Sequence, residues 1–281
     1  MIPDLHMHTT VSDGSDTPAE LLIRVKEADI DCFSVTDHDA IKAAELIPPL
    51  LGPGDPLFIP GVEFSCRDGA DKYHILGYGY DPAAAPIREL VDRGHRARME
   101  KVLARLEFLK TAFGFTFPPE EIDALTALDN PGKPHIGNLM VKYGYAATRK
   151  QAIDEFINRK HFSNDVYLHP RQAVEAILAS GGIPVLAHPF FGSGDELILG
   201  EEMERRLRLL TGCGLKGIEV FYSGFTHKLR KDALALAEKY RLYATAGSDY
   251  HGSNKLVRLG DTGLPAGELP PPVDRFLALF R

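Results

Sequence analysis

The sequence has little of several features that mark common classes of protein. Its 281 residues include no tryptophan and only three cysteines, at positions 32, 66 and 213. An odd number of widely spaced cysteines indicates neither a disulfide framework nor a thiolate zinc site. No apolar run approaches the roughly 20 residues that span a bilayer. The N-terminus also lacks the basic segment and apolar stretch of an export signal. We therefore expect a cytoplasmic protein with no membrane partner.

Positive charge is not in excess either. The chain has 32 lysines and arginines against 39 aspartates and glutamates, a formal net charge of −7. This balance argues against an extended nucleic-acid surface, but it leaves room for a local basic pocket that binds a small anion. A Gly-x-x-x-x-Gly-Lys-Ser/Thr loop, a dinucleotide fingerprint and a Gly-x-Ser-x-Gly elbow are all absent. The sequence gives no indication of oligomeric state.

Apolar segments alternate with helical patterns along most of the chain. Strands are expected at 32–36, 57–62, 73–80, 182–187, 217–221 and 242–246. Thr17-Pro18-Ala19-Glu20 has the features of a helix start, with an N-cap threonine, a proline in the first turn and a capping glutamate. The alternation predicts an α/β fold with βα units and a mainly parallel sheet, whose functional groups gather at the carboxyl ends of the strands.

The alternation of strand and helix patterns gives way to helical patterns alone between about residues 86 and 165. Helices are expected there over 87–109, 119–128, 136–143 and 149–158. We predict an inserted helical cap domain at 86–165 that lies over the active rim of a domain built from 1–85 and 166–281. An exposed appendage that only stabilises the protein is the alternative.

Residue types that commonly bind metal ions occur within the first 13 residues of the chain. His6 and His8 are two positions apart, so in an extended strand both side chains point to one face, and Asp13 follows shortly after. Polar residues at later strand ends complete a set of nine candidate ligands: His6, His8, Asp13, His38, Glu63, His74, His188, Asp249 and His251. Because one ion takes four to six ligands, this set predicts two or three divalent metals.

These motifs resemble the PHP (polymerase and histidinol phosphatase) superfamily of metal-dependent phosphoesterases. The similarity covers the family's opening His-x-His and the Thr-Asp-His, Gly-x-Glu and Ala-His-Pro motifs, which end at His38, Glu63 and Pro189 here, and the final Gly247-Ser248-Asp249-Tyr250-His251. It implies a distorted (β/α)7 barrel and the branch with an inserted helical cap, which acts on small phosphorylated metabolites. It also implies Mn²⁺, Fe²⁺ or Zn²⁺ in a trinuclear centre.

The resemblance further implies how the ligands divide among the metals. His6, His8, Glu63 and Asp249 would hold one ion, Asp13, His38 and His251 a second, and Glu63, His74 and His188 a third. Asp13, His38, Glu63, His188 and Asp249 are the expected catalytic residues. Asp37 and Asp39 flank His38, so either could orient an imidazole, with helix capping as the alternative for Asp39. Glu219, in an apolar strand, has either a buried ion pair or a supporting role near the metals.

Substrate contacts are expected from the cap. Lys133 and His135 precede a predicted helix, and related proteins with a cap use a comparable segment to contact phosphate. Arg159 and Lys160 form a second basic cluster there, for which an ordinary solvated surface is the alternative.

We therefore expect metal-dependent hydrolysis of phosphate esters of small metabolites by a metal-bound hydroxide. Nucleoside or sugar phosphates are favoured, including bisphosphates and cyclic phosphodiesters, because the resembling branch contains such enzymes. A 5′-end exonuclease on short oligonucleotides and a histidinol-phosphate phosphatase are alternatives, as are a non-catalytic metal-binding module and a metal-dependent C–N hydrolase.

Overall fold

The computed structural model describes residues 1–163, 166–191 and 197–281. Along the chain the elements are β1 (Pro3–Asp4), α1 (Pro18–Glu27), β2 (Cys32–Phe33), α2 (Ala43–Leu46), η1 (Pro48–Leu50), β3 (Leu57–Phe58), β4 (Gly61–Asp68), β5 (Asp71–Tyr78), α3 (Ala85–Phe113), α4 (Pro119–Thr126), α5 (Lys133–Lys142), α6 (Arg149–Gln151), η2 (Ala152–Phe156), η3 (Ile157–Arg159), α7 (Pro170–Ala179), β6 (Ile183–Leu186), α8 (Gly200–Gly212), β7 (Gly217–Tyr222), α9 (His227–Lys239), β8 (Tyr243–Gly247), η5 (Gly252–Asn254) and α10 (Pro271–Leu277). None of the helices in these ranges has the length and apolar character that a membrane crossing requires.

The strands form two sheets with mixed pairing. One sheet has the order β1-β2-β3 and is parallel, whereas the other has the order β4-β5-β6-β7-β8. In the second sheet β5 is antiparallel to both β4 and β6, and only β6, β7 and β8 run in parallel. The expectation of a mainly parallel sheet was therefore wrong for β4 and β5. Gly69, with φ of 59°, lies in the short connection between these two strands and makes them a hairpin rather than a βα unit.

Single bridges link the two sheets. Met7 pairs with Tyr250, and His38 pairs with Glu63. Neither sheet is closed within the described part of the chain. These bridges bring the segments after β1, β2 and β8 to the first residues of β4, where the candidate ligands lie.

The predicted helix start at Thr17 is confirmed. Its side chain accepts a hydrogen bond from the backbone N–H of Glu20, and the Glu20 side chain accepts one from the Thr17 N–H. This capping box satisfies two backbone donors that the first turn of α1 would otherwise leave unpaired. Leu21, Leu22 and Val25 are buried on the inner face of α1.

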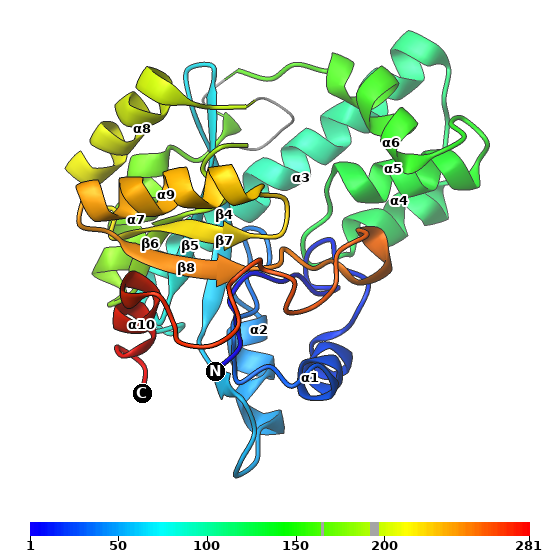
Figure 1. The fold of residues 1–281 in the computed structure, drawn as a ribbon. Coiled ribbons are helices and arrows are strands. Elements are labelled where there is room, and N and C mark those ends of the chain that lie inside the picture. The colour runs from blue at the N-terminus through cyan, green and yellow to red at the C-terminus, as the bar shows by residue number, and fades with distance from the viewer. Residues whose placement is uncertain (164–165, 192–196) are drawn as a thin grey trace.

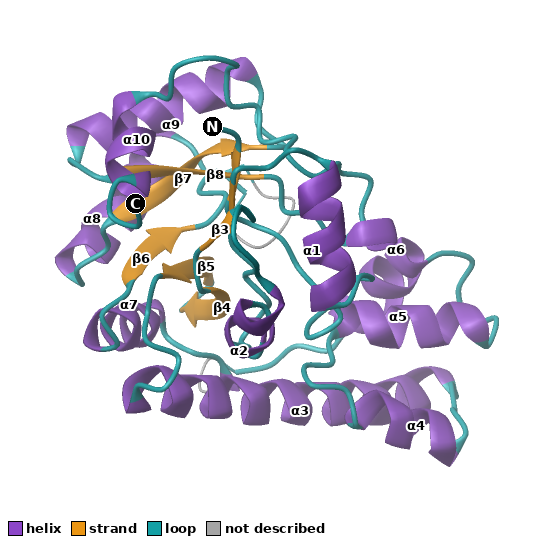
Figure 2. Cartoon of the chain, turned by 90° about the horizontal axis from the view of Figure 1, so that it is seen from below, coloured by secondary structure: helices purple, strands orange, loops and turns teal. Residues whose placement is uncertain are grey.

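Three apolar clusters stabilise the fold. The largest joins β4–β8 to α7, α8 and α10, and a second packs α1 against β1–β3. The third lies entirely among the helices between residues 102 and 157, where Val102, Leu109, Ile136 and Met140 are buried together. Figure 1 shows these helices as a lobe beside the strands, and Figure 2 shows α3 running from α7 to α4.

The helical region follows the predicted order but differs in its boundaries. Helix α3 covers 29 residues and ends at Gly114, which has φ of 71° and therefore favours glycine as a C-cap. The expected helix at 149–158 is divided into a short α-helix, a π-helical turn and a 3₁₀ turn. Because α3 contributes Ile87 and Leu90 to the largest cluster, it is shared between the strands and the lobe. The expected boundary at residue 165 lies outside the described residues.

Candidate metal centre

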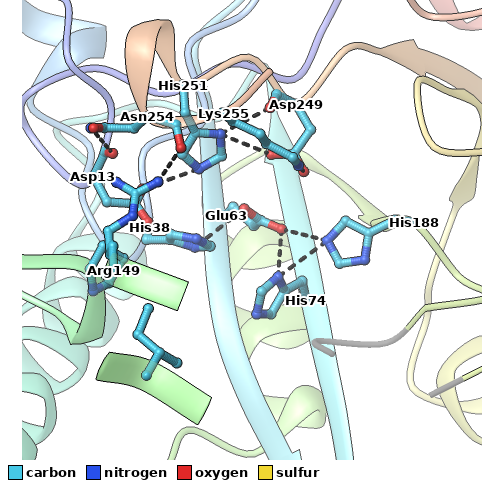
Figure 3. A pocket seen from close by; sticks show the side chains of 12 residues that line it. Asp13, His38, Glu63, His74, Arg149, His188, Asp249, His251, Asn254 and Lys255 are labelled. Atoms are coloured by element: carbon cyan, nitrogen blue, oxygen red, sulfur yellow. Dashed lines mark hydrogen bonds and ion pairs between the residues drawn. The ribbon is translucent and has the colours of Figure 1, made fainter. Parts of the chain in front are cut away.

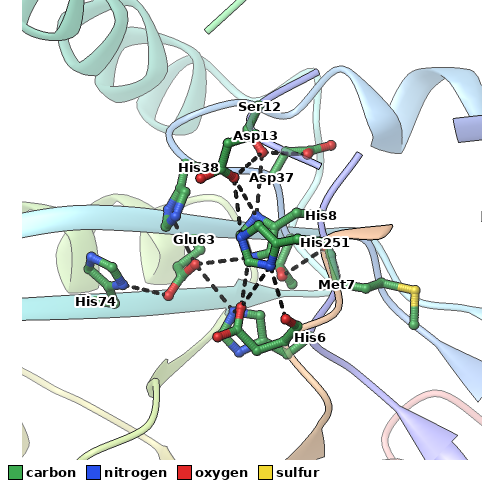
Figure 4. A network of polar contacts seen from close by, with 12 residues as sticks. His6, Met7, His8, Ser12, Asp13, Asp37, His38, Glu63, His74 and His251 are labelled. Atoms are coloured by element: carbon green, nitrogen blue, oxygen red, sulfur yellow. Dashed lines mark hydrogen bonds and ion pairs between the residues drawn. The ribbon is translucent and has the colours of Figure 1, made fainter. Parts of the chain in front are cut away.

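All nine predicted ligands converge on one site. They come from six segments of the chain that lie far apart in sequence, and Figure 4 shows the side chains of those it labels gathered together. His6, His8 and Asp13 follow β1, His38 follows β2, His188 follows β6, and Asp249 and His251 follow β8. The remaining two, Glu63 and His74, lie inside the hairpin strands β4 and β5. Most ligands therefore follow strand ends as predicted, and the hairpin supplies the exceptions.

Glu63 lies at the centre of the site. Its Oε2 atom is 3.2 Å from Nε2 of His6 and 3.2 Å from Nε2 of His8. Oδ1 of Asp249 completes this group, at 3.5 Å from the His6 nitrogen and 3.4 Å from the His8 nitrogen. The other carboxylate oxygen of Glu63, Oε1, lies 2.8 Å from Nδ1 of His74 and 3.2 Å from Nε2 of His188. One glutamate thus contacts two separate groups of imidazoles.

A further group forms around Asp13. Its Oδ1 atom lies 3.3 Å from Nε2 of His251 and 3.7 Å from Nδ1 of His8. His38 belongs to the same cluster, where the ligand atoms of all four residues are within 4.8 Å of one another. His38 also approaches Glu63, with 3.2 Å between Nδ1 and Oε2. This imidazole can therefore be assigned to either of two groups.

The donor set fits divalent metal ions. Atoms held at about 2.1 Å from one ion lie roughly 3.0–3.4 Å apart, depending on the coordination geometry. The separations of 3.2 Å between Glu63 and His6, His8 and His188 fall within this range. Nε2 of His8 and Nδ1 of His38 are buried and make no hydrogen bond within the described residues, which is costly for polar atoms unless a ligand meets them. Imidazole and carboxylate donors together suit Mn²⁺, Fe²⁺ or Zn²⁺.

The carboxylates of the site are held in their ionised form. Burial alone would raise the pKa of Glu63, but the nearby charges of His74, His6 and His38 outweigh it and hold the pKa well below its usual value. For Asp249, burial is likewise outweighed by His6 and by Lys255, and its pKa is also well below the usual value. Ionised carboxylates are the form that binds a cation.

Two of the ligands are in the left-handed backbone region. His188 has φ of 25° and Asp249 has φ of 59°, and each lies two residues after the end of a strand. Non-glycine residues rarely adopt this conformation, and they keep it where the surrounding structure holds them. The strain here turns both side chains from the ends of β6 and β8 toward Glu63.

A cavity of about 300 Å³ opens onto the ligand cluster, and we call it the metal-side pocket. Besides seven of the ligands it is lined by Pro134, Arg149, Ile153, Asn254 and Lys255 (Figure 3). Arg149 comes from the helical lobe and donates a hydrogen bond to the backbone carbonyl of Asn254. The Nζ atom of Lys255 contacts Oδ2 of Asp249, opposite the oxygen that faces the histidines. Sequence reasoning missed Arg149 and Lys255, because neither belongs to a local motif of known chemistry.

A second cavity, of about 170 Å³, adjoins the site, and His74 lines both cavities. We call it the basic pocket because six cationic side chains line it: Arg67, Lys72, Arg98, Lys101, Arg105 and Lys133. Asp39, which pairs with Arg98, is the ion-pair partner of this group within the described residues. Nε of Arg105 is buried without a hydrogen-bond partner there. Burial, and to a smaller extent the neighbouring cations, lower the pKa of Lys101 and of Lys133 to about 8.

The predicted substrate contacts from the cap fall in different places. Lys133 lines the basic pocket, as its role would require. Nδ1 of His135 accepts a hydrogen bond from the Gly132 N–H at 3.0 Å and so caps α5. Arg159 lies over the ring of Phe113, and Lys160 over that of Phe162. Neither Arg159 nor Lys160 lines the metal-side pocket or the basic pocket.

The aspartates beside His38 do not orient its ring. Asp37 accepts hydrogen bonds from Thr9 and Ser12 and so holds the loop that carries Asp13. Asp39 accepts one from the Ser65 N–H and pairs with Arg98. Neither carboxylate forms a direct hydrogen bond with an imidazole among the described residues, although Ser12, which donates to Asp37, also lies 3.4 Å from Nδ1 of His8. In the left-handed backbone conformation, with φ of 49°, Asp39 is directed toward the lobe instead.

Known proteins resemble the chain over nearly its whole length. It is 33% identical over 266 residues to a phosphoribosyl 1,2-cyclic phosphate 1,2-diphosphodiesterase from Eggerthella lenta, which covers 90% of this chain and 95% of that protein. The chain belongs to the PHP superfamily of metal-dependent phosphoesterases. It is therefore a phosphoric ester hydrolase. No family model matches it.

Other relatives of this PHP phosphoesterase act on different phosphate esters. A 3′,5′-nucleoside bisphosphate phosphatase from Chromobacterium violaceum is 30% identical and covers 95% of this chain and 92% of its own. A 5′-3′ exoribonuclease, Rnm, from Salmonella typhimurium is also 30% identical, with 95% and 91% covered. A solved structure from Bifidobacterium adolescentis, assigned as a metal-dependent phosphoesterase, superimposes with a TM-score of 0.82 at 25% identity over 98% of this chain and 95% of its own.

Proposed function

We propose that this PHP phosphoesterase hydrolyses a phosphate ester of a small metabolite that carries a second phosphate group. The observation that carries the proposal is the basic pocket, which adjoins the ligand cluster through His74. Six cations around one cavity, five of them buried or half-buried, repel one another, and a bound dianion would relieve the repulsion. One phosphate would react at the ligand cluster, and the other would bind in the basic pocket.

Two or three divalent ions, Mn²⁺, Fe²⁺ or Zn²⁺, are proposed as cofactors, held by the three ligand groups around Glu63 and Asp13. When bound, such ions lower the pKa of a coordinated water toward ~7 and neutralise charge on the phosphate oxygens. We place His6, His8, Glu63 and Asp249 in one group, Asp13, His38 and His251 in a second, and Glu63, His74 and His188 in a third. The separations around Glu63 support this division, and His38 is also within reach of the first group.

The protein itself would orient the substrate between two sets of cations. Arg149 and Lys255 reach the metal-side pocket from the lobe and from the segment after β8. Lys133 and Lys101 line the other side, in the basic pocket. We propose that residues 86–165 form a cap that supplies Arg149 and Lys133 to the substrate. The alternative of a purely stabilising appendage does not account for two cations that the lobe directs into these pockets.

We also infer that the strands form one distorted barrel around the ligand cluster. The bridges from Met7 to Tyr250 and from His38 to Glu63 support this, because one joins the segments after the edge strands β1 and β8 and the other joins the segment after β2 to β4. In such an arrangement the segments after β1, β2, β6 and β8 open at one rim.

Nucleoside or sugar bisphosphates fit the proposal best, and five-membered cyclic phosphodiesters fit where the sugar carries a further phosphate group outside the ring. The relatives from Chromobacterium violaceum and Eggerthella lenta act on these two classes of compound. Removal of nucleotides from a short oligonucleotide is a second candidate, which the Rnm relative favours. A net charge of −7 disfavours long polynucleotides.

The proposal is tested by measuring phosphate release from a panel of substrates with the Mn²⁺-loaded enzyme. The panel pairs adenosine 3′,5′-bisphosphate with AMP, and adds ribose cyclic phosphates, sugar phosphates, histidinol phosphate and a trinucleotide. We expect kcat/KM for the bisphosphate to exceed that for AMP by about 10–100-fold, since a buried charge-assisted contact contributes about 1.5–3 kcal/mol. Equal values for the two nucleotides would contradict a role for the second phosphate.

A further inference from the structure

Glu219 is a buried carboxylate that contacts two of the candidate ligands without belonging to any ligand group. It lies in β7, and its side chain is fully buried. Its Oε1 atom is 3.0 Å from Nδ1 of His6, and its Oε2 atom accepts a hydrogen bond of 2.7 Å from the backbone N–H of His188. Among the described residues, His6 is its partner for an ion pair.

The backbone around Glu219 is shaped to permit this contact. A Cβ atom on Gly247, in the neighbouring strand β8, would come within 2.5 Å of Oε1 of Glu219 and 2.3 Å of Cβ of His6. Only glycine therefore allows the two side chains to meet. The pairing of β7 with β8 also shifts register between Glu219 and Phe221, which marks an irregularity in β7 at this residue.

Burial of a carboxylate is costly unless its hydrogen bonds repay the lost hydration. No lysine or arginine among the described residues pairs with Glu219. Its two oxygens instead bind the ring of His6 and the main chain of His188. Both of these contacts therefore go to candidate metal ligands, His6 and His188.

The contact with His6 determines which ring nitrogen can bind a cation. A neutral imidazole carries one proton, and a carboxylate beside Nδ1 holds that proton on Nδ1. The lone pair is then on Nε2, the atom that faces Glu63 and Asp249 at 3.2 Å and 3.5 Å. The contact with His188 holds the main chain of a residue whose φ is 25°. Glu219 thus supports one ligand in each of two groups that share Glu63.

We propose that Glu219 is a positioning residue for the metal centre, which fixes the tautomer of His6 and the strained backbone of His188. Carboxylates that hold a ligating histidine in this way typically contribute 10–100-fold to metal affinity. The inference concerns metal binding alone, so its test does not depend on which ester is the substrate.

The test compares Glu219→Gln with the wild-type protein in a Mn²⁺ titration of metal-free enzyme, in which free Mn²⁺ is counted by electron paramagnetic resonance. Glutamine preserves size and burial, but it has one acceptor oxygen where the carboxylate has two. If that oxygen accepts from the His188 N–H, the amide N–H donates to Nδ1 of His6 and favours the tautomer with its proton on Nε2. We expect at least one Mn²⁺ to bind 10–100-fold more weakly. The melting temperature of the metal-free protein should stay within a few degrees of the wild-type value.

Two further variants keep the test decisive. Thr245→Val alters the residue that pairs with Glu219 across β7 and β8, and it should leave Mn²⁺ affinity within twofold of the wild type. Glu219→Asp keeps the charge but shortens the side chain, so it should also weaken Mn²⁺ binding. If Glu219→Gln does not fold, as judged by circular dichroism, Glu219→Asp takes its place. Wild-type Mn²⁺ affinity in a folded variant at position 219 would overturn the proposal.

Discussion

Oε1 of Glu63 and Nδ1 of His74 lie 2.8 Å apart across the β4–β5 hairpin, although the strand register pairs Glu63 with Leu76 and His74 with Ser65. The two side chains share one face of the hairpin and meet diagonally, two residues apart. The hairpin that departs from the expected βα pattern therefore carries both of these ligands. It also presents His74 to the metal-side pocket and the basic pocket together.

Loss of a ligand should remove most of the activity while the fold remains intact. Asp13→Asn or His188→Ala should lower kcat by at least ~10²-fold, because fewer donors remain to bind and activate a metal-bound water. Steady-state phosphate release and circular dichroism measure the two properties. Asp232→Asn, on the exposed surface of α9, is the matched control and should retain wild-type activity. Wild-type turnover in either ligand variant would count heavily against the assignment.

Removal of metal should destabilise the protein. Ions that bind only the folded state stabilise it by about 2.7 kcal/mol when their free concentration is 100-fold above Kd. Dialysis against a chelator should therefore lower the melting temperature and abolish phosphate release, and added Mn²⁺ should restore both. The measurement is differential scanning calorimetry paired with an activity assay. A melting temperature that is insensitive to the chelator would argue that the imidazole cluster stays empty in the native protein.

Removal of a cation from the basic pocket should impair substrate binding selectively. Lys133→Ala should raise KM for a bisphosphate by about 10–100-fold, the equivalent of one charge-assisted contact. Values of kcat, and of KM for a monophosphate, should change much less, provided that the lysine binds ground and transition states equally. Lys110→Ala, on the exposed side of α3, controls for the general loss of positive charge. An equal effect on both substrates would place Lys133 outside the second phosphate site.

The basic pocket should also make bisphosphate binding depend on pH. The pKa values of Lys101 and Lys133 are about 8, so both ammonium groups are charged below that pH and lose their protons above it. The phosphate groups remain dianionic in this range, because their second pKa is about 6. KM for the bisphosphate should thus rise about tenfold between pH 8 and pH 9. Initial rates in Lys133→Ala should show a weaker rise, whereas a flat KM in the wild type would contradict the assignment.

Much of the ligand set could be predicted from sequence because its members belong to short motifs. His6 and His8 share a face of an extended segment, and Asp249 and His251 repeat that spacing after β8. The helix start at Thr17 was equally predictable, since a capping box depends on residues only three positions apart. These are local properties of the chain.

What could not be predicted depends on contacts between distant segments. Arg98 and Lys101 lie on the long charged helix α3, where they look like ordinary solvated residues until the fold places them over β4 and β5. Lys255 and Arg149 reach the metal-side pocket from opposite sides for the same reason. The antiparallel course of β5 was also hidden, because an apolar run of this length fits a strand of either direction.

The central claim is that the convergent imidazoles and carboxylates hold two or three divalent ions that make the site active. It is tested most directly by adding Mn²⁺ in steps to the metal-free enzyme and measuring bound manganese, by mass spectrometry of the protein fraction, and phosphate release in the same samples. We predict that two or three equivalents bind per chain and that activity rises with their occupancy. Full phosphate release at less than one bound metal ion per chain would contradict the account.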